Sequence, residues 1–211
     1  MSFVSRALKR WFFSSSSYWE KRYRDGGNSG AGSYNELAAY KADFINNFIR
    51  ANGVTRLFDF GSGDGNQAGY LQVESYLGVD VSKTAVTMCR DKFKSDSKKR
   101  FVVYNPDTFK TEIAAYKPQL SISMDVLYHL VEDEVFTKYM TELFETAGEH
   151  VVIYASNFDS KDKSLHHRDR NFTPFVERTF PQWSLVKTET NPHRDKSIAD
   201  FFVYTREQAA V

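Results

Sequence analysis

The sequence predicts an α/β fold of the Rossmann-like, doubly wound type, in which a mostly parallel seven-stranded sheet carries helices on both faces. Three observations lead to this prediction. Short apolar runs alternate with longer amphipathic stretches, as strands and helices do around a parallel sheet. A glycine-rich loop, residues 61–65, directly follows the first of these runs. The last two runs, residues 183–189 and 201–205, have no helix between them, which indicates an antiparallel strand pair at one edge.

The composition fits one domain with a substantial core. Of the 211 residues 41% are hydrophobic. The sequence contains no run of 18 or more apolar residues, the length that a membrane span requires. The 28 Lys and Arg residues nearly balance the 27 Asp and Glu residues, so net charge does not draw the chain toward nucleic acid. The single cysteine, Cys89, excludes an internal disulfide and suits a reducing compartment. We therefore expect a cytoplasmic protein in which Cys89 is a small buried helix residue.

Seven runs rich in β-branched and aromatic residues are expected to form the strands. Turn-forming pairs separate some of them: Asn105-Pro106 ends the third run, and Lys117-Pro118 precedes the fourth. The predicted strands are residues 55–60, 76–80, 100–104, 120–126, 150–155, 183–189 and 201–205.

The stretches between these runs show helical spacing of apolar residues. Ser33 is placed to cap the first long helix, residues 34–51, which Gly53 ends. Ser82 is placed to cap the second long helix. Further helical stretches are expected at residues 67–72, 132–148 and 172–180.

Residues 1–17 combine apolar residues at helical spacing with basic residues between them, which predicts a short basic amphipathic helix. Two interpretations stay open. The helix either packs on the domain and covers its site, or it serves targeting, as a weak membrane-surface contact through residues 1–13 or as part of an organelle transit peptide. We divide the chain into residues 1–33, an amino-terminal helix and glycine-rich lid, and residues 34–211, the main domain.

The glycine loop favours S-adenosylmethionine over a dinucleotide. A pyrophosphate site requires the spacing Gly-x-Gly-x-x-Gly, which turns a helix amino end toward the phosphates, whereas this loop reads Gly-x-Gly-x-Gly. Asp59 precedes the loop and Asp64 lies within it. Their negative charge suits a cofactor with an amino group and a sulfonium better than a pyrophosphate. A nucleotide-dependent oxidoreductase is therefore the weaker alternative.

Two further acids come at the ends of strands. Asp80 ends the second strand, where a carboxylate can accept hydrogen bonds from both ribose hydroxyls. Asp107 follows the third strand and is placed to receive the adenine amino group. It suits equally well the cap of a helix over residues 108–116.

Three segments together resemble the class I S-adenosylmethionine-dependent methyltransferases. They are the glycine-loop segment 57–65, the segment Gly-Val-Asp-Val-Ser at 78–82, and the segment Met-Asp-Val-Leu-Tyr-His-Leu-Val-Glu-Asp at 124–133. The resemblance extends over residues 54–155, about half of the chain. One departure is the short connection between the glycine loop and the second strand, which leaves the cofactor contacts there open.

The resemblance implies where the cofactor lies. Gly61 and Gly63 would bracket its methionine end, Asp80 would hold the ribose, and Asp125 with Val126 would lie under the methionyl part. The expected cofactor-binding residues are Tyr18, Trp19, Tyr23, Arg24, Asp59, Gly61, Ser62, Gly63, Asp80, Val81, Asp107, Thr108, Asp125 and Val126.

Residues 18–27 resemble the amino-terminal lid of the small-molecule methyltransferases in this class, and the glycines and serines that follow them suit a segment that closes over a ligand. Tyr18, Trp19 and Tyr23 could offer aromatic faces to a sulfonium, and Arg24 could pair with the methionyl carboxylate. The alternative is a linker with a few anchoring aromatic residues.

The acceptor side is expected around His129, which follows the fourth strand. Its imidazole is a candidate general base, because an unperturbed histidine titrates near neutral pH. The alternative is that His129 positions the cofactor or caps the following helix. Candidate substrate-binding residues are Tyr128, His166, His167, Arg168 and Arg170. The basic members form either a pocket for an anionic or sugar-like acceptor or a solvated surface. No metal site is expected.

The sequence thus predicts an enzyme that transfers a methyl group from S-adenosyl-L-methionine and releases S-adenosyl-L-homocysteine. The expected acceptor is an oxygen, less readily a nitrogen, of a small polar molecule such as a saccharide or an anionic metabolite. A non-catalytic S-adenosylmethionine-binding accessory protein and a nucleic-acid or protein methyltransferase are the alternatives. We expect no nucleic-acid partner, because the chain has no Asn-Pro-Pro-Tyr-type tetrapeptide and its net charge is near zero.

Overall fold

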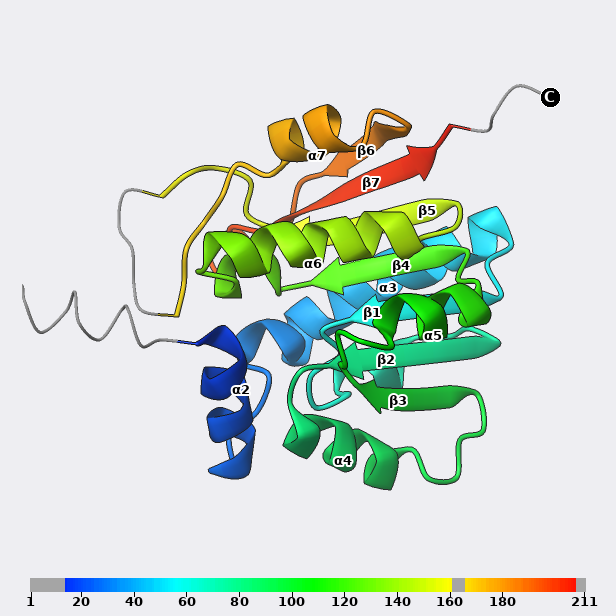
Figure 1. The fold of residues 1–211 in the computed structure, drawn as a ribbon, viewed down its shortest axis with the longest axis vertical. Coiled ribbons are helices and arrows are strands. Elements are labelled where there is room, and N and C mark those ends of the chain that lie inside the picture. Colours follow the sequence, from blue (N-terminus) through cyan, green and yellow to red (C-terminus); the bar gives the residue numbers. More distant parts are fainter. Residues whose placement is uncertain (1–13, 161–165, 208–211) are drawn as a thin grey trace, which may run out of the picture.

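The computed structural model describes residues 14–160 and 166–207. In Figure 1 a central twisted sheet lies between two layers of helices. Residues 1–13, the candidate membrane-contact segment and most of the predicted amino-terminal helix, lie outside the described residues. None of the described helices is long and apolar enough to cross a membrane.

Seven strands form one mixed sheet. They are β1 (Arg56–Phe60), β2 (Ser75–Asp80), β3 (Lys99–Val103), β4 (Leu120–Met124), β5 (His150–Ala155), β6 (Trp183–Glu189) and β7 (Asp200–Arg206). The order is β3-β2-β1-β4-β5-β7-β6. β7 runs antiparallel to both of its neighbours, and every other pairing is parallel. The predicted doubly wound, mostly parallel sheet with an antiparallel edge pair is confirmed.

The helices connect the strands and cover both faces of the sheet. They are α2 (Ser15–Arg24), α3 (Asn35–Asn52), α4 (Lys83–Lys92), α5 (Phe109–Tyr116), α6 (Asp133–Thr146) and α7 (Thr173–Thr179). Three short 3-10 helices lie in the connections between these elements: η1 (Ala31–Ser33), η2 (Gln67–Tyr70) and η3 (Leu127–His129).

The ends of the elements test the capping predictions. Ser82 caps α4 as predicted, because its hydroxyl accepts a hydrogen bond from the Ala85 N–H at 3.0 Å. Gly53 ends α3 in the left-handed conformation with φ 61°. The prediction that Ser33 caps α3 is wrong, since Ser33 belongs to η1 and Tyr34 takes the cap position without a side-chain hydrogen bond. The predicted strand 120–126 is too long, because Asp125 has φ 60° and cannot continue the extended β4.

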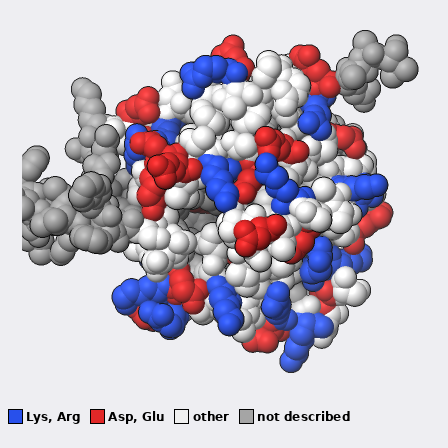
Figure 2. All heavy atoms as spheres, viewed as in Figure 1, with Lys and Arg blue, Asp and Glu red and all other residues white. Residues whose placement is uncertain are grey.

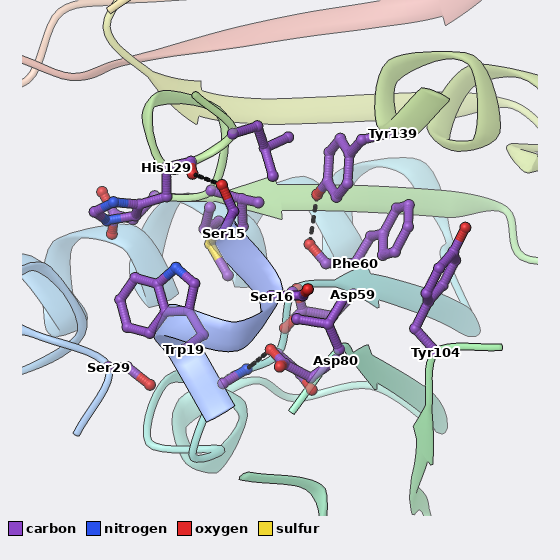
Figure 3. Close-up of a pocket in the computed structure, with 18 of the residues that line it drawn as sticks. Ser15, Ser16, Trp19, Ser29, Asp59, Phe60, Asp80, Tyr104, His129 and Tyr139 are labelled. Carbon is purple, nitrogen blue, oxygen red and sulfur yellow. Dashed lines mark hydrogen bonds between the residues drawn. The ribbon is translucent and has the colours of Figure 1, made fainter. Parts of the chain in front are cut away.

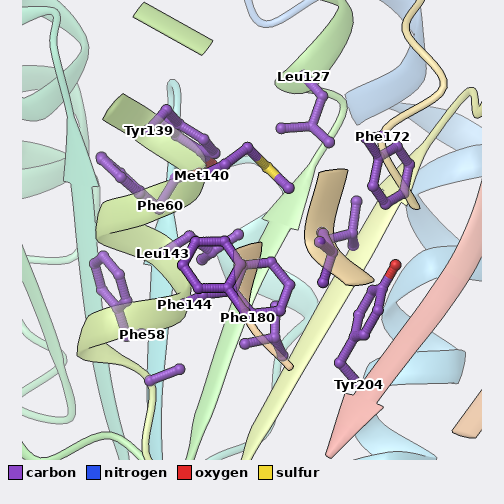
Figure 4. Packing of buried hydrophobic residues seen from close by; sticks show 14 of the residues in the cluster. Phe58, Phe60, Leu127, Tyr139, Met140, Leu143, Phe144, Phe172, Phe180 and Tyr204 are labelled. Carbon is purple, nitrogen blue, oxygen red and sulfur yellow. The ribbon is translucent and has the colours of Figure 1, made fainter. Parts of the chain in front are cut away.

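Alternation of side chains along the strands produces two hydrophobic cores, one on each face of the sheet. Phe58 and Phe60 of β1 pack with α5, α6 and α7 in one core, part of which Figure 4 shows. Leu57, the residue before Phe58, faces the other core with α3 and α4. Cys89 of α4 is buried in this second core, as expected. The two cores fix the strands so that β1, β2 and β4 end at the same edge, beside α2 (Figure 1).

Gly78 in β2 gives a first testable prediction, because a Cβ atom there would lie 2.7 Å from the Phe101 ring and 2.9 Å from the Ser62 Cβ. Both neighbours are held by the sheet and the glycine loop, so neither can move freely. We expect Gly78→Ala to lower the free energy of unfolding by about 1–3 kcal/mol, measured by urea denaturation. Gly69→Ala is the control, because a Cβ there meets its nearest atom at 3.9 Å. Equal midpoints for the two variants would contradict this account of the packing.

Candidate functional site

A cavity of about 440 Å³ lies where the carboxyl ends of β1, β2 and β4 meet α2. Figure 2 shows this face of the molecule hollowed below α6, with charged side chains at the rim. The volume falls within the range of about 300–1,000 Å³ that small-molecule sites occupy. Its walls come from α2, the glycine loop, the end of β2, η3 and α6, which Figure 3 shows converging from distant parts of the chain.

The glycine loop forms the floor of the cavity. The N–H groups of Gly61 and Ser62 donate to the Val79 carbonyl at 2.7 and 3.2 Å, which ties the loop to the end of β2. Gly61 has φ 93°, and a Cβ atom there would lie 2.5 Å from a Val126 methyl group. Only glycine allows this turn with so close an approach to the chain after β4.

Asp80 and Asp59 bring two buried carboxyl groups to the cavity. The Asp80 carboxylate accepts hydrogen bonds from the backbone N–H of Gly63 at 2.9 Å and of Ser82 at 2.8 Å. Burial nevertheless raises the pKa of Asp80 to about 6. Asp59 accepts one hydrogen bond, from the Tyr76 hydroxyl at 2.6 Å, and burial raises its pKa to about 7.

Asp125 occupies the turn after β4 and anchors a small polar network. Its carboxylate forms an ion pair with Lys41 of α3 and accepts a hydrogen bond from the Tyr128 hydroxyl at 2.6 Å. The Lys41 side chain is 1% exposed and its ammonium lies 5.3 Å from the centre of the Tyr154 ring. Because Lys41 also lines the cavity, it brings a cation to the same wall as Asp125.

Segment 14–33 covers the cavity and is held by polar contacts along its length. Ser15 donates its N–H to Glu132 at 2.8 Å, and its hydroxyl lies within hydrogen-bond distance of both the Glu132 carboxylate and the His129 carbonyl. Farther on, the N–H of Ser29 donates to Asp64 in the glycine loop at 2.8 Å. Trp19 and Tyr23 from α2 line the cavity from this side. The segment therefore lies where the sequence predicts a lid.

His129 lies in η3 at the cavity wall, with its ring 4.8 Å from that of Trp19. Its Nδ1 is 3.0 Å from the carbonyl oxygen of His166. Since a carbonyl only accepts hydrogen bonds, Nδ1 carries the proton in the neutral ring and Nε2 keeps its lone pair. Burial lowers the pKa of His129 to about 4, so the ring is neutral at physiological pH.

The other end of the cavity is aromatic. Phe60, Tyr104 and Tyr139 form its walls, with the Phe60 ring stacked on Tyr139 at 4.1 Å and lying 5.8 Å from Tyr104. The Tyr139 hydroxyl donates to the Phe60 carbonyl at 2.6 Å and fixes this arrangement (Figure 3). Glu142 of α6, 4% exposed, adds a carboxylate at the same end.

The structure brings most of the predicted cofactor residues together. Those that line the cavity are Trp19, Tyr23, Asp59, Gly61, Ser62, Gly63, Asp80, Val81, Asp125 and Val126, and His129 joins them from the predicted catalytic position. Three predicted cofactor residues, Arg24, Asp107 and Thr108, are exposed on the surface and do not line it. Tyr18 is also outside the lining and instead stacks on His166 at 5.1 Å.

The predicted substrate-binding residues lie behind the cavity wall rather than in it. The His167 ring stacks on Tyr128 at 4.8 Å, next to His129. Arg168 and Arg170 form ion pairs with Asp133 at 2.8 and 2.5 Å and donate to backbone carbonyls of the loop before α6. In this structure the two guanidinium groups therefore hold that loop in place.

Sequence reasoning missed Lys41, Tyr104, Tyr139 and Glu142. A signal for Lys41 was present, because it follows Leu37 by four positions on the apolar face of the first long helix, where a lysine is out of place. Glu142 likewise lies between two pairs of buried residues of α6, Tyr139-Met140 and Leu143-Phe144. A buried charge at such a position indicates a paired or functional group.

No protein-family model matches the chain. No curated protein matches it in sequence. Solved structures, in contrast, match it in fold over most of its length. The N-methyltransferase NodS from Bradyrhizobium japonicum WM9, in complex with S-adenosyl-L-homocysteine, has 10% identity and a TM-score of 0.66, covering 92% of this chain and 99% of NodS.

Two further structures illustrate the range of these neighbours. Magnesium protoporphyrin IX methyltransferase ChlM from Synechocystis PCC 6803 has 14% identity and a TM-score of 0.61, covering 95% of this chain and 99% of ChlM. The methyltransferase domain of bacterial CtHen1 has 17% identity and a TM-score of 0.61, covering 80% of this chain and 97% of that domain. The predicted class I methyltransferase fold is confirmed.

The buried Asp59 carboxyl gives a prediction about stability and pH. Its pKa is raised from 3.8 to about 7, so the folded protein binds an extra proton between these values and loses stability as pH rises from about 4 to 7. We expect Asp59→Asn to raise the melting temperature of the ligand-free protein by a few degrees at pH 8, with a smaller gain at pH 5. Asp43→Asn, on the exposed face of α3, is the control and should change little. A gain that does not depend on pH would contradict the assignment.

Proposed function

We propose that this chain binds S-adenosylmethionine and transfers its methyl group to a small polar acceptor. One observation carries the proposal: one cavity at the strand ends is lined by the glycine loop, Asp80 and His129 together. The fold supports it, because NodS was solved with S-adenosylhomocysteine and ChlM with both S-adenosylmethionine and S-adenosylhomocysteine.

The polar groups of the cavity fit this cofactor. Each Asp80 oxygen accepts one backbone hydrogen bond, so each retains a lone pair for a ribose hydroxyl. The Ser62 hydroxyl is buried and, among the described residues, has no hydrogen-bond partner, which suits a group that bonds to a ligand. The aromatic end formed by Phe60, Tyr104 and Tyr139 suits a flat purine.

The methionyl end would lie between the glycine loop and Asp125. When bound, the cofactor supplies a methyl group on a sulfonium, and Asp59 contributes negative charge near this positive end. Lys41 lines the cavity and is the better candidate than the exposed Arg24 to pair with the methionyl carboxylate. Trp19 and Tyr23 present their rings from α2, as the lid hypothesis requires.

His129 is the proposed general base for a hydroxyl acceptor. Its Nε2 keeps a lone pair and the ring lines the cavity beside Trp19. A pKa of about 4 makes it a weak base in the ligand-free protein, so its contribution depends on holding the acceptor hydroxyl in line with the methyl group. Such a role requires no change of protonation before the acceptor binds.

We propose that the acceptor is a hydroxyl of a small polar molecule of the saccharide or anionic-metabolite class. The Ser15 and Ser16 side chains and His129 line the acceptor end, where they could hydrogen-bond to a polar molecule. Segment 14–33 covers this end, which favours a small acceptor over a polymer. The second candidate is a non-catalytic accessory protein that binds the cofactor, and the placement of His129 favours the enzyme over it.

Cofactor binding can be tested at Asp80. Removal of its carboxylate should abolish the ribose contacts and release the Gly63 N–H from its acceptor. We expect Asp80→Ala to weaken S-adenosylhomocysteine binding by about tenfold or more, measured by isothermal titration calorimetry. Asp91→Ala, an exposed acid on α4, should retain the wild-type affinity. Equal affinities in Asp80→Ala and wild type would remove the ribose site from this position.

The base role of His129 can be separated from a positioning role by kinetics. With an acceptor found by screening with labelled methyl donor, we expect His129→Ala to lower kcat by about 10²–10⁴-fold and to leave cofactor affinity within a few-fold. The acid limb of the wild-type pH profile should lie near pH 4, because that is where burial places the His129 pKa. His150→Ala is the control, because His150 begins β5 and does not line the cavity, and it should leave kcat near the wild-type value. Loss of cofactor affinity with unchanged kcat would assign His129 to positioning.

A further inference from the structure

We infer that Glu142 reads the exocyclic amino group of the adenine, a role that the sequence suggested for Asp107. The inference rests on the proposed S-adenosylmethionine-binding function and goes beyond it by assigning the residue that distinguishes adenine from other purines. It places base recognition on helix α6 instead of the loop after β3.

The order of groups along the cavity points to this end for the base. In Figure 3 Asp80 lies between Trp19 and His129 on one side and Tyr104 on the other. With the ribose on Asp80 and the methyl group near His129, the purine has to extend toward Tyr104. There the cavity has aromatic walls, and Glu142 lines it as well.

The Glu142 carboxylate has fewer hydrogen-bond donors around it than its two oxygens can accept from. The Tyr104 hydroxyl lies 2.8 and 3.0 Å from the two carboxylate oxygens, but it has a single proton to give. Lys138 is 3.8 Å away, beyond hydrogen-bond distance. Within residues 14–160 and 166–207 these are the polar partners of the carboxylate, so at least one oxygen has no full hydrogen bond.

A buried carboxylate in this state destabilises the ligand-free protein, and burial raises its pKa accordingly. A ligand N–H would supply the missing donor. The exocyclic amino group of adenine is the hydrogen-bond donor on the base, and a carboxylate facing C6 accepts from it. A 6-oxo purine presents an acceptor oxygen at C6, and its own donor, N1–H, lies one ring position away. Asp107, in contrast, is exposed and does not line the cavity.

The test compares two ligands that differ only at positions 6 and 1 of the purine ring. Binding of S-adenosylhomocysteine and of S-inosylhomocysteine, which carries an oxygen in place of the amino group, is measured by calorimetry for each protein. We expect the wild type to prefer the adenosyl ligand by about tenfold or more. Glu142→Gln should reduce this preference to within about threefold, because the amide can turn its own N–H toward the 6-oxo group.

Matched variants decide between Glu142 and the alternatives. Asp107→Asn makes the same chemical change at the residue after β3, and it should keep the wild-type preference. Tyr104→Phe removes the donor that orients Glu142, and it should lower the preference less than Glu142→Gln does. Melting curves check that each variant is folded. If Glu142→Gln does not fold, the ligand preferences of Tyr104→Phe and Asp107→Asn still show which of the two acids determines the preference for the adenosyl ligand.

The outcomes are distinct. An unchanged preference in Glu142→Gln, or a preference lost in Asp107→Asn, would overturn the inference while leaving cofactor binding intact. If the wild type binds neither ligand, the proposed function itself fails.

Discussion

The hydrogen bonds between the glycine loop and the end of β2 fix the rest of the site. The N–H of Gly61 donates to the Val79 carbonyl at 2.7 Å, and the N–H of Gly63 donates to the Asp80 carboxylate at 2.9 Å. They pull the loop across the strand ends and orient Asp80 into the cavity. They also bring Gly61 so close to Val126 that no side chain fits between them. The loop, Asp80 and the turn after β4 therefore form one unit, and a shift in any of them moves the other two.

This unit concentrates negative charge. Five acidic side chains line the cavity, Asp59, Asp64, Asp80, Asp125 and Glu142, against the two cations Lys41 and Lys138. Burial raises the pKa of Asp59, Asp80 and Glu142, which means that their ionised forms are held at a cost to folding. A ligand that brings positive charge and N–H or O–H donors offsets that cost, whereas a pyrophosphate would add to it. The electrostatics of the folded site thus agree with the glycine spacing of the loop, which favours S-adenosylmethionine over a dinucleotide.

The fold and the part of the site formed by the glycine loop and the strand ends could be predicted from the sequence, because both depend on local signals. Strand runs, the Ser82 cap and the glycine spacing act within a few residues, and the structure keeps them. The part of the site that α6 contributes depends instead on which face of that helix packs against which loop. Asp107 comes directly after β3 yet is exposed, whereas Glu142 reaches the cavity from α6 only because that helix packs over Phe60 and Tyr104. Tertiary packing decides this, and a single sequence does not carry it.

The covering segment 14–33 depends on the same unit. Glu20 of α2 accepts hydrogen bonds from the Ser82 and Thr84 hydroxyls at 2.7 Å each, at the amino end of α4, and these bonds lower its pKa. The N–H of Ser82 meanwhile donates to Asp80. Ser82 thus links segment 14–33 to Asp80, the carboxylate proposed to hold the ribose. At the other end, Ser15 bonds to the carbonyl of His129. Since both anchors are residues that flank the cavity, movement of either on ligand binding would act directly on the position of α2.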